Sequence, residues 1–98
     1  MKRIVEVHYR VRSGCRDEFY RAVSESGIAA ASRAEAGNEK YDYYFSPTDP
    51  DELVLIEVWS SPEAVQAHSG TEHYQKLMQL KKEYVAETRF ARYDAESL

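Results

Sequence analysis

The chain has 98 residues and a formal net charge of −4, which predicts a single domain over residues 1–98 and argues against a nucleic-acid partner. No apolar run approaches the roughly 20 residues of a membrane helix, and the opening MKRIVEVHYR is not typical of a signal peptide. The only cysteine, Cys15, has no partner for an internal disulfide. We therefore expect a cytoplasmic protein that does not contact membranes.

The first half of the chain predicts a strand, a long helix and a second strand. Residues Ile4–Arg12 alternate between apolar and polar, as a half-buried strand does. Cys15–Ala36 contains no proline and carries apolar residues at helical spacing, with Gly27 as a weak point inside this helix. Gly37-Asn38 is a plausible stop, and Glu39–Phe45 is rich in strand-forming residues.

The second half predicts a turn, a strand, an interrupted helix and a final strand. Ser61 is a favourable N-cap before Pro62, and Thr71 can cap a new helical segment after Ser69-Gly70 interrupts the first. The predicted elements are the turn Ser46–Glu52, the strand Leu53–Trp59, helical segments from Pro62 and from Thr71 to about Tyr84, and the strand Thr88–Tyr93.

The order β-α-β-β-α-β predicts an α+β, ferredoxin-like fold, in which the helices cover one face of an antiparallel four-stranded sheet. The strand Leu53–Trp59 is apolar on both faces. One face carries Leu53, Leu55 and Trp59, and the other carries Val54, Ile56 and Val58. Because helices cover only one face, we expect a homodimer in which an identical subunit covers the other.

His68 is the strongest candidate for a catalytic residue. It lies three residues after Val65 and four after Ala64 on the helix that begins at Pro62, so these side chains share the face expected to pack on the sheet. An imidazole in that position can titrate near neutral pH and act as a base. The alternative is a core or helix-end histidine that hydrogen-bonds a backbone carbonyl.

Glu57 and Trp59 lie two residues apart on one strand face, near His68 in the chain. Trp59 could form the wall of a pocket and donate its indole N–H. Glu57 could orient a base or a nearby donor, or act as a base itself. The alternative is an ordinary core tryptophan beside a glutamate that pairs with a basic residue on a neighbouring strand.

Four further residues are candidates for substrate binding. Tyr41 and Tyr43 share one face of their strand, and their hydroxyls could hydrogen-bond a substrate oxygen. Tyrosines in strands also serve packing and interfaces, which is the alternative. His73 and Tyr74 follow Thr71 and could form the rim of a pocket, or be an ordinary exposed first turn.

The sequence contains no dinucleotide-binding, P-loop, C-x-x-C or H-E-x-x-H motif. The three histidines, His8, His68 and His73, do not have the spacing of a zinc site, so we expect no metal. His8 alternates with charged Glu6 and Arg10, which favours a place at the subunit interface.

The stretches EAGNEKYDYY and LVLIEVWSSPEAVQAHSGTEHYQKL resemble the antibiotic biosynthesis monooxygenase domain family, and the resemblance covers nearly the whole chain. The matching positions are Gly14, Gly37, Asn38, Tyr41, Glu57, Trp59, Val65 to His68, Thr71, His73 and Tyr74. The resemblance implies ferredoxin-like subunits whose sheets join into a dimeric α+β barrel. Glu39 departs from the family pattern, in which an apolar residue is usual.

The resemblance also implies a function, a cofactor-independent monooxygenase that oxidises a quinol or phenol with O₂. His68 would be the catalytic base, assisted by Glu57 and Trp59, and no cofactor or metal would be used. Tyr41, Tyr43, His73 and Tyr74 would bind the small aromatic or carbonyl substrate. One alternative is a non-oxidative isomerase of a small phosphorylated signalling molecule, with Lys40 and Arg33 as its basic groups. The other is a non-catalytic, dimeric ligand-binding or stress-response module.

Overall fold

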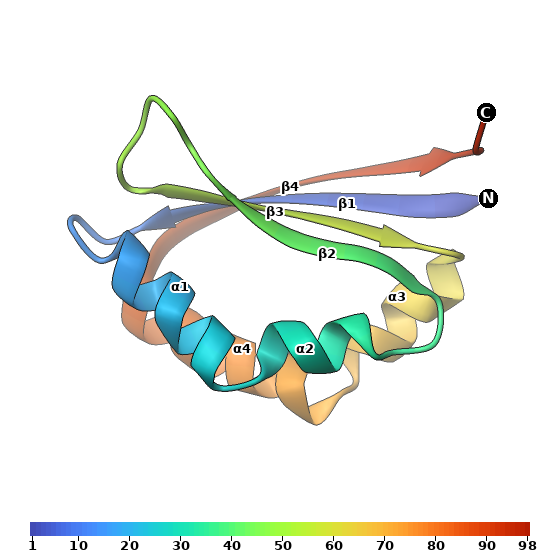
Figure 1. The fold of residues 1–98 in the computed structure, drawn as a ribbon, viewed down its shortest axis with the longest axis horizontal. Helices are drawn as coiled ribbons and strands as arrows, with labels where there is room; N and C mark the ends of the chain where they lie inside the picture. Colours follow the sequence, from blue (N-terminus) through green and yellow to red (C-terminus); the bar gives the residue numbers. More distant parts are fainter.

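A computed structural model describes all 98 residues and shows one antiparallel sheet with every helix on the same face (Figure 1). The strand order is β2-β3-β1-β4. The elements are β1 Lys2–Val11, α1 Arg16–Glu25, α2 Ile28–Arg33, β2 Asn38–Phe45, β3 Glu52–Trp59, α3 Pro62–Ser69, α4 Glu72–Tyr84 and β4 Val85–Ala95. This architecture confirms the predicted ferredoxin-like α+β fold. None of the helices has the length and apolar character needed to cross a membrane.

The prediction of one helix over Cys15–Ala36 is wrong. Gly27 adopts a left-handed conformation, with φ of +79°, and separates α1 from α2. Glycine reaches this conformation without the steric cost that other residues have, so the chain turns here instead of continuing as a helix. The second helix ends at Arg33, before the predicted stop, and residues 34–37 form a turn into β2.

The alternating burial of β3 confirms which of its residues share a face. Leu53, Leu55 and Trp59 on the helix-covered face are almost completely buried, at 0–1% exposure, whereas Val54, Ile56 and Val58 on the opposite face are only partly buried. Phe19 and Val23 from α1 complete this side of the core, and Phe19 packs edge-on against Tyr9 of β1. The same layer holds the polar residues described below.

Two side-chain caps determine where α3 and α4 begin, as predicted. The Ser61 hydroxyl accepts a hydrogen bond from the backbone N–H of Ala64, and the Thr71 hydroxyl accepts one from Tyr74. Thr71 also donates its hydroxyl proton to the carbonyl of His68 at 2.8 Å. The caps therefore hold the end of α3 against the start of α4, which brings His68 close to the first turn of α4.

Candidate functional site

A cavity of about 220 Å³ lies between the sheet and the helices α3 and α4. Its walls are mostly apolar and come from β1, β4, α3 and α4, with Tyr41 of β2 and Glu57 of β3. Ligand sites of typical small molecules have volumes of about 300–1,000 Å³. This cavity is therefore better matched to a single ring than to a polycyclic compound.

His68 is in the last turn of α3 and lines this cavity, although its side chain is only 5% exposed. Its Nδ1 lies 2.5 Å from Oε2 of Glu35, and its Nε2 makes no hydrogen bond to the protein. When Nδ1 donates its proton to a carboxylate, the neutral ring keeps its lone pair on Nε2. In this tautomer the ring has a fixed orientation, and its acceptor nitrogen is available to a ligand.

Glu35 is the site residue that the sequence interpretation missed. In a continuous helix over Cys15–Ala36 it would belong to the last turn and would have no special position. The turn after α2 instead directs it to His68, which is 33 residues away in the chain. The sequence signal that could have revealed it is Gly27, because a break in the helix at Gly27 lets the second helix end before Glu35.

Trp59 and Glu57 form a buried pair next to His68. The indole N–H of Trp59 donates to Oε1 of Glu57 at 2.9 Å, and the indole lies 4.8 Å from the His68 ring, centroid to centroid. Burial raises the pKa of Glu57, while the bond from Trp59 and the nearby His68 act in the opposite direction. Glu57 therefore orients the indole, and the carboxylate that contacts His68 is that of Glu35.

Two tyrosines complete the wall around His68. Tyr41 and Tyr74 both line the cavity and present their rings edge-on to the imidazole, with centroids 5.8 Å and 5.3 Å away. The buried hydroxyl of Tyr41 has no hydrogen-bond partner, and burial raises its pKa. A neutral phenol that lacks a partner is a suitable donor to an oxygen of a bound ligand.

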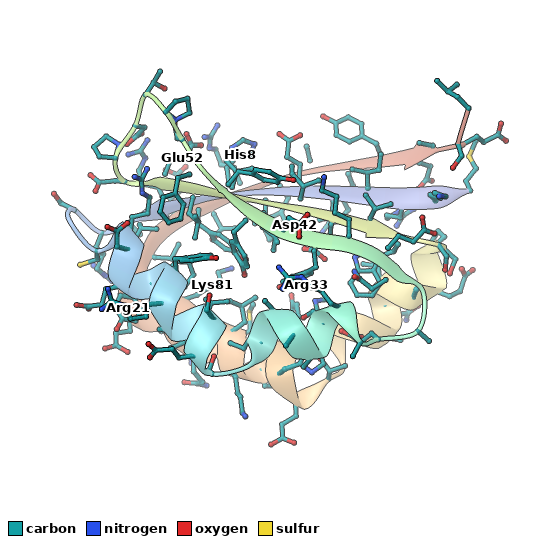
Figure 2. The ribbon with its side chains drawn as sticks, in the orientation of Figure 1. His8, Arg21, Arg33, Asp42, Glu52 and Lys81 are labelled. Carbon is teal, nitrogen blue, oxygen red and sulfur yellow. The ribbon has the colours of Figure 1, made fainter.

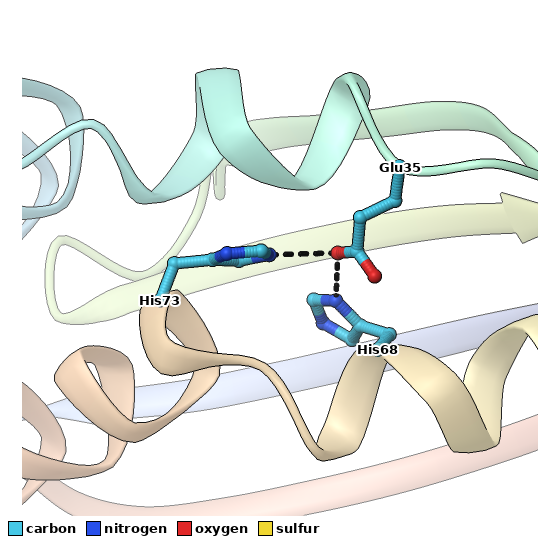
Figure 3. A group of neighbouring side chains, drawn as sticks. All are labelled: Glu35, His68 and His73. Carbon is cyan, nitrogen blue, oxygen red and sulfur yellow. Dashed lines mark hydrogen bonds and ion pairs between the residues drawn. The ribbon is translucent and has the colours of Figure 1, made fainter.

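His73 contacts Glu35 but does not line the cavity. Its Nε2 is 2.7 Å from the same Oε2 atom that contacts His68, so one carboxylate oxygen bridges two imidazoles (Figure 3). The histidines belong to different helices, as the sequence indicated, but their rings converge on Glu35. Spacing along the chain alone did not reveal this cluster.

The basic groups at the cavity differ from those expected. Arg33 donates from Nε to the carbonyl of Tyr41, and Lys40 lies over the ring of Tyr44, so neither lines the cavity. Lys81 of α4 and Arg92 of β4 do line it, and burial lowers the pKa of Lys81. Figure 2 shows Lys81 in the layer between the sheet and the helices.

Comparison with known proteins gives the family. The family model described as antibiotic biosynthesis monooxygenase matches residues 3–80. The chain belongs to the antibiotic biosynthesis monooxygenase family. A Bacillus subtilis protein described as "Putative monooxygenase YcnE" is 29% identical over 84 residues, which cover 85% of each chain.

Solved structures of similar proteins support the same fold. The "Putative antibiotic biosynthesis monooxygenase from Nitrosomonas europaea" has a TM-score of 0.85 at 24% identity, covering 95% of this chain and 97% of that one. Rv0793 from Mycobacterium tuberculosis has a TM-score of 0.86 at 24% identity, covering 100% and 98%. At these identities the likeness shows the fold alone.

The residues of the family resemblance divide into two layers in this family member. His68, Glu57, Tyr41 and Tyr74 line the cavity directly. Three other predicted site residues do not line it: Trp59 and His73 lie behind His68, and Tyr43 packs against Tyr20 and Tyr41.

Proposed function

We propose that this family member is a cofactor-independent monooxygenase that oxidises a small quinol or phenol with O₂. The observation that carries the proposal is the state of His68, whose Nδ1 is bonded to Glu35 while Nε2 is unpartnered at a largely apolar cavity. A base in such a site can remove a phenolic proton and keep water from the anion. The family name and the description of the Bacillus subtilis relative support the same reaction class.

The reaction draws its electrons from the substrate. Nε2 of His68 takes a proton from a quinol hydroxyl, because the anion transfers electrons to O₂ more readily than the neutral quinol. One quinol and one O₂ then give one hydroxyquinone and one water. Oxidation of the two hydroxyls and conversion of a ring C–H bond to C–O together supply the four electrons that O₂ accepts. The proton held by His68 returns to the oxygen atom that leaves as water.

The lining of the cavity supports a single aromatic ring as the substrate. Tyr41 can donate its unpartnered hydroxyl to a substrate oxygen, and Tyr74 can pack against the ring. Leu77 and Met78 of α4 supply apolar surface on the helix side. Glu57 adds a carboxyl group, which burial keeps closer to its neutral form.

The direct test measures oxygen uptake with single-ring quinols. We expect the wild-type chain to consume one O₂ per quinol and to place an atom of isotopically labelled O₂ in the product. His68→Gln should lower kcat by roughly 10²–10⁴-fold, the usual contribution of a general base. Melting temperatures of both proteins show whether the variant is folded. Unchanged oxygen uptake in folded His68→Gln would show that His68 is not the base.

Glu35 is proposed as a positioning residue that acts through His68. Glu35→Gln keeps an oxygen that can accept from Nδ1 but removes the charge, so kcat should fall while KM for the quinol stays close to the wild-type value. Glu72→Gln is the matched control, because Glu72 is an exposed carboxylate in the first turn of α4. A loss of activity explained by unfolding alone would also appear as a lower melting temperature, and would argue against the positioning role.

A second candidate function is the non-oxidative isomerisation of a small phosphorylated compound. Lys81 and Arg92 favour it, because two cationic side chains at one cavity can bind an anionic group. Product formation under strict exclusion of oxygen distinguishes the two reactions, since an isomerase forms product without O₂ and a monooxygenase does not. If neither reaction occurs although a ligand binds, the chain is a binding module, and His68→Gln changes only its stability.

We also propose that the open face of the sheet is covered by a second copy of the chain. Val54, Ile56 and Val58 are only half-buried there, and Tyr44 and Tyr93 are 44% and 53% exposed. Light scattering on the wild-type protein should give the mass of a dimer. Ile56→Lys should give a folded monomer, because a charge at the centre of an apolar contact opposes association. A monomeric wild-type protein would exclude the proposed dimer.

A further inference from the structure

The carboxylate of Glu35 has an unusual set of partners. Its two partners in hydrogen bonds and ion pairs are the imidazoles of His68 and His73, and no lysine or arginine pairs with it. One ligating atom from each of the three residues lies within 4.8 Å of the others. Figure 3 shows both rings directed at the carboxylate from α3 and α4, while Glu35 reaches down from the turn after α2.

Two imidazoles and one carboxylate are a donor set that divalent transition ions prefer. Histidine nitrogens and glutamate oxygens bind Zn²⁺ at about 2.0–2.2 Å, and two histidines with one glutamate leave a position for water. Nδ1 of His68 and Nε2 of His73 now face Oε2 through protons. If these protons leave, the two nitrogen lone pairs converge on the present position of Oε2, and an ion can bind between the three residues once the carboxylate draws back.

We propose that Glu35, His68 and His73 form a binding site for a divalent first-row transition ion, with Zn²⁺ as the best-matched member of the class. Tetrahedral bonds of about 2.0–2.1 Å place ligand atoms roughly 3.3 Å apart. The present nitrogen–oxygen distances of 2.5 Å and 2.7 Å must widen by less than about 1 Å to reach this value. Glu35 can make this movement, because its flexible side chain starts from a turn and not from a helix or strand.

The surroundings of the three residues suit a bound ion. The Glu35 and His73 side chains are 14% and 17% exposed, which leaves a path for the ion and a water ligand. His68 is nearly buried and is held by Trp59 on one side and Tyr74 on another. One carboxylate with two neutral imidazoles gives the site a net negative charge, which favours a dication.

This site shares one ring with the proposed base, so the consequence for activity rests on the proposed function. A metal ion on Nδ1 of His68 takes the nitrogen that now carries the proton. The neutral ring then carries its proton on Nε2, which becomes a donor and can no longer accept a proton from a quinol. Binding of the ion at Glu35, His68 and His73 is therefore expected to stop the oxidation.

The test is a titration of the untagged, chelator-treated chain with Zn²⁺ by calorimetry, repeated with Co²⁺ followed by visible absorption. We expect one ion per chain and a rise of the melting temperature with Zn²⁺. His73→Gln removes a ligand outside the cavity and should weaken binding by at least about 100-fold, beyond the loss typical when a residue that only hydrogen-bonds a ligand is changed. His8→Gln is the matched control, because His8 also contacts two carboxylates but lies on the other face of the sheet.

Absence of binding, or binding that His73→Gln leaves intact, would overturn the metal site. Binding that is lost in His8→Gln instead would do the same, because it would place the ion on the open face of the sheet. The titration requires no turnover, so a failure of the proposed oxidation leaves its result standing. Where quinol oxidation is observed, Zn²⁺ should inhibit the wild-type protein at the concentrations that fill the site. Undiminished activity at full occupancy would overturn the inhibitory role.

Discussion

The two faces of the sheet treat the same kinds of residue differently. On the helix-covered face, Leu53 and Trp59 are fully buried, and Glu57, the charged residue on this face of β3, accepts a hydrogen bond from the indole of Trp59. On the open face, Val54 and Ile56 are half-buried, and His8 lies between two carboxylates near solvent, in view above the sheet in Figure 2.

The comparison shows that environment, and not residue type, distinguishes the candidate site. His8 and His68 each contact a glutamate at 2.5 Å. His68 does so in a buried layer beside a cavity, where a polar group is costly unless it is fully partnered. His8 does so among partly exposed ion pairs near the surface, which contribute little. The proposed chemistry therefore belongs to the covered face and the proposed subunit contact to the open face.

The largest effect on stability is expected in the apolar core on the helix-covered face of the sheet. Phe19 is fully buried and packs against Tyr9 and Tyr84. Phe19→Ala should lower the free energy of unfolding by about 3–5 kcal/mol, because it removes a ring from a close-packed core. Urea unfolding measures this loss. Tyr20→Ala is the control on the same helix, since Tyr20 is 39% exposed and should cost much less. Equal losses would mean that this part of the core is not tightly packed.

A smaller effect is expected where β2 begins against α3. Gly37 has φ of +86°, and a Cβ there would lie 2.8 Å from Cβ of Ala64, which cannot rotate away. Gly37→Ala should therefore combine backbone strain of about 1–2 kcal/mol with overpacking of about 1–3 kcal/mol. Gly14→Ala is the matched control, because Gly14 has φ of +76° but open space around it.

The difference between these two glycine variants in thermal or urea unfolding isolates the contact with α3. The same contact supports the helix that carries His68, so Gly37→Ala should also reduce oxygen uptake while Gly14→Ala should not. Equal stability losses in the two variants would show that α3 can shift to accommodate a methyl group.

The next prediction concerns the buried pair of Glu57 and Trp59 on the helix-covered face. Burial raises the folded-state pKa of Glu57, so the folded chain favours the neutral carboxyl, and wild-type stability declines as the pH rises above the ordinary value near 4.5. Glu57→Gln removes this cost and still accepts from Trp59. Its unfolding free energy should exceed that of the wild type at pH 7, and the two should converge towards pH 4.5.

Glu57→Leu is the contrasting variant. It also removes the buried charge but leaves the indole N–H of Trp59 without an acceptor, at a cost of about 1–3 kcal/mol. Urea unfolding of both variants separates the charge from the hydrogen bond. If Leu were as stable as Gln at this position, the bond from Trp59 would contribute nothing to stability.

The fold was predictable because its signals are local. Alternation in β1 and β3, the Ser61 cap before Pro62 and the Thr71 cap each depend on a few neighbouring residues. His68 was predictable for the same reason, because its spacing from Val65 gives its helix face.

The rest of the site was not predictable, because it depends on contacts between distant segments. Glu35 reaches His68 and His73 across 33 and 38 residues of chain, and only a left-handed Gly27 and the early end of α2 make that possible. Likewise, Lys81 and Arg92 meet at the cavity through the packing of α4 on the sheet, which no short motif encodes. A correct sequence prediction of this site would require the helix break at Gly27 first.

The smallest effect is expected on the open face, at His8. The hydrogen bond to Glu6 raises the pKa of His8, burial opposes this rise, and the weaker effect of the bond to Glu52 adds to it. Arg89 bonds the same Glu52 oxygen. Since the folded-state pKa lies above the ordinary value of 6.5, protonated His8 stabilises the folded chain. This stabilisation is fully present below pH 6.5 and is lost as the pH rises through the folded-state pKa.

His8→Gln should therefore lower stability only at acidic to neutral pH, by at most about 1 kcal/mol, as for other ion pairs near the surface. Melting curves of both proteins across this pH range, at one protein concentration, measure the difference. If the second copy of the chain covers this face, burial there strengthens the bonds to Glu6 and Glu52 and the same substitution should weaken the dimer at low pH. A pH-independent difference between the two proteins would mean that His8 is neutral throughout, and the contrast between the two histidines would then be one of packing alone.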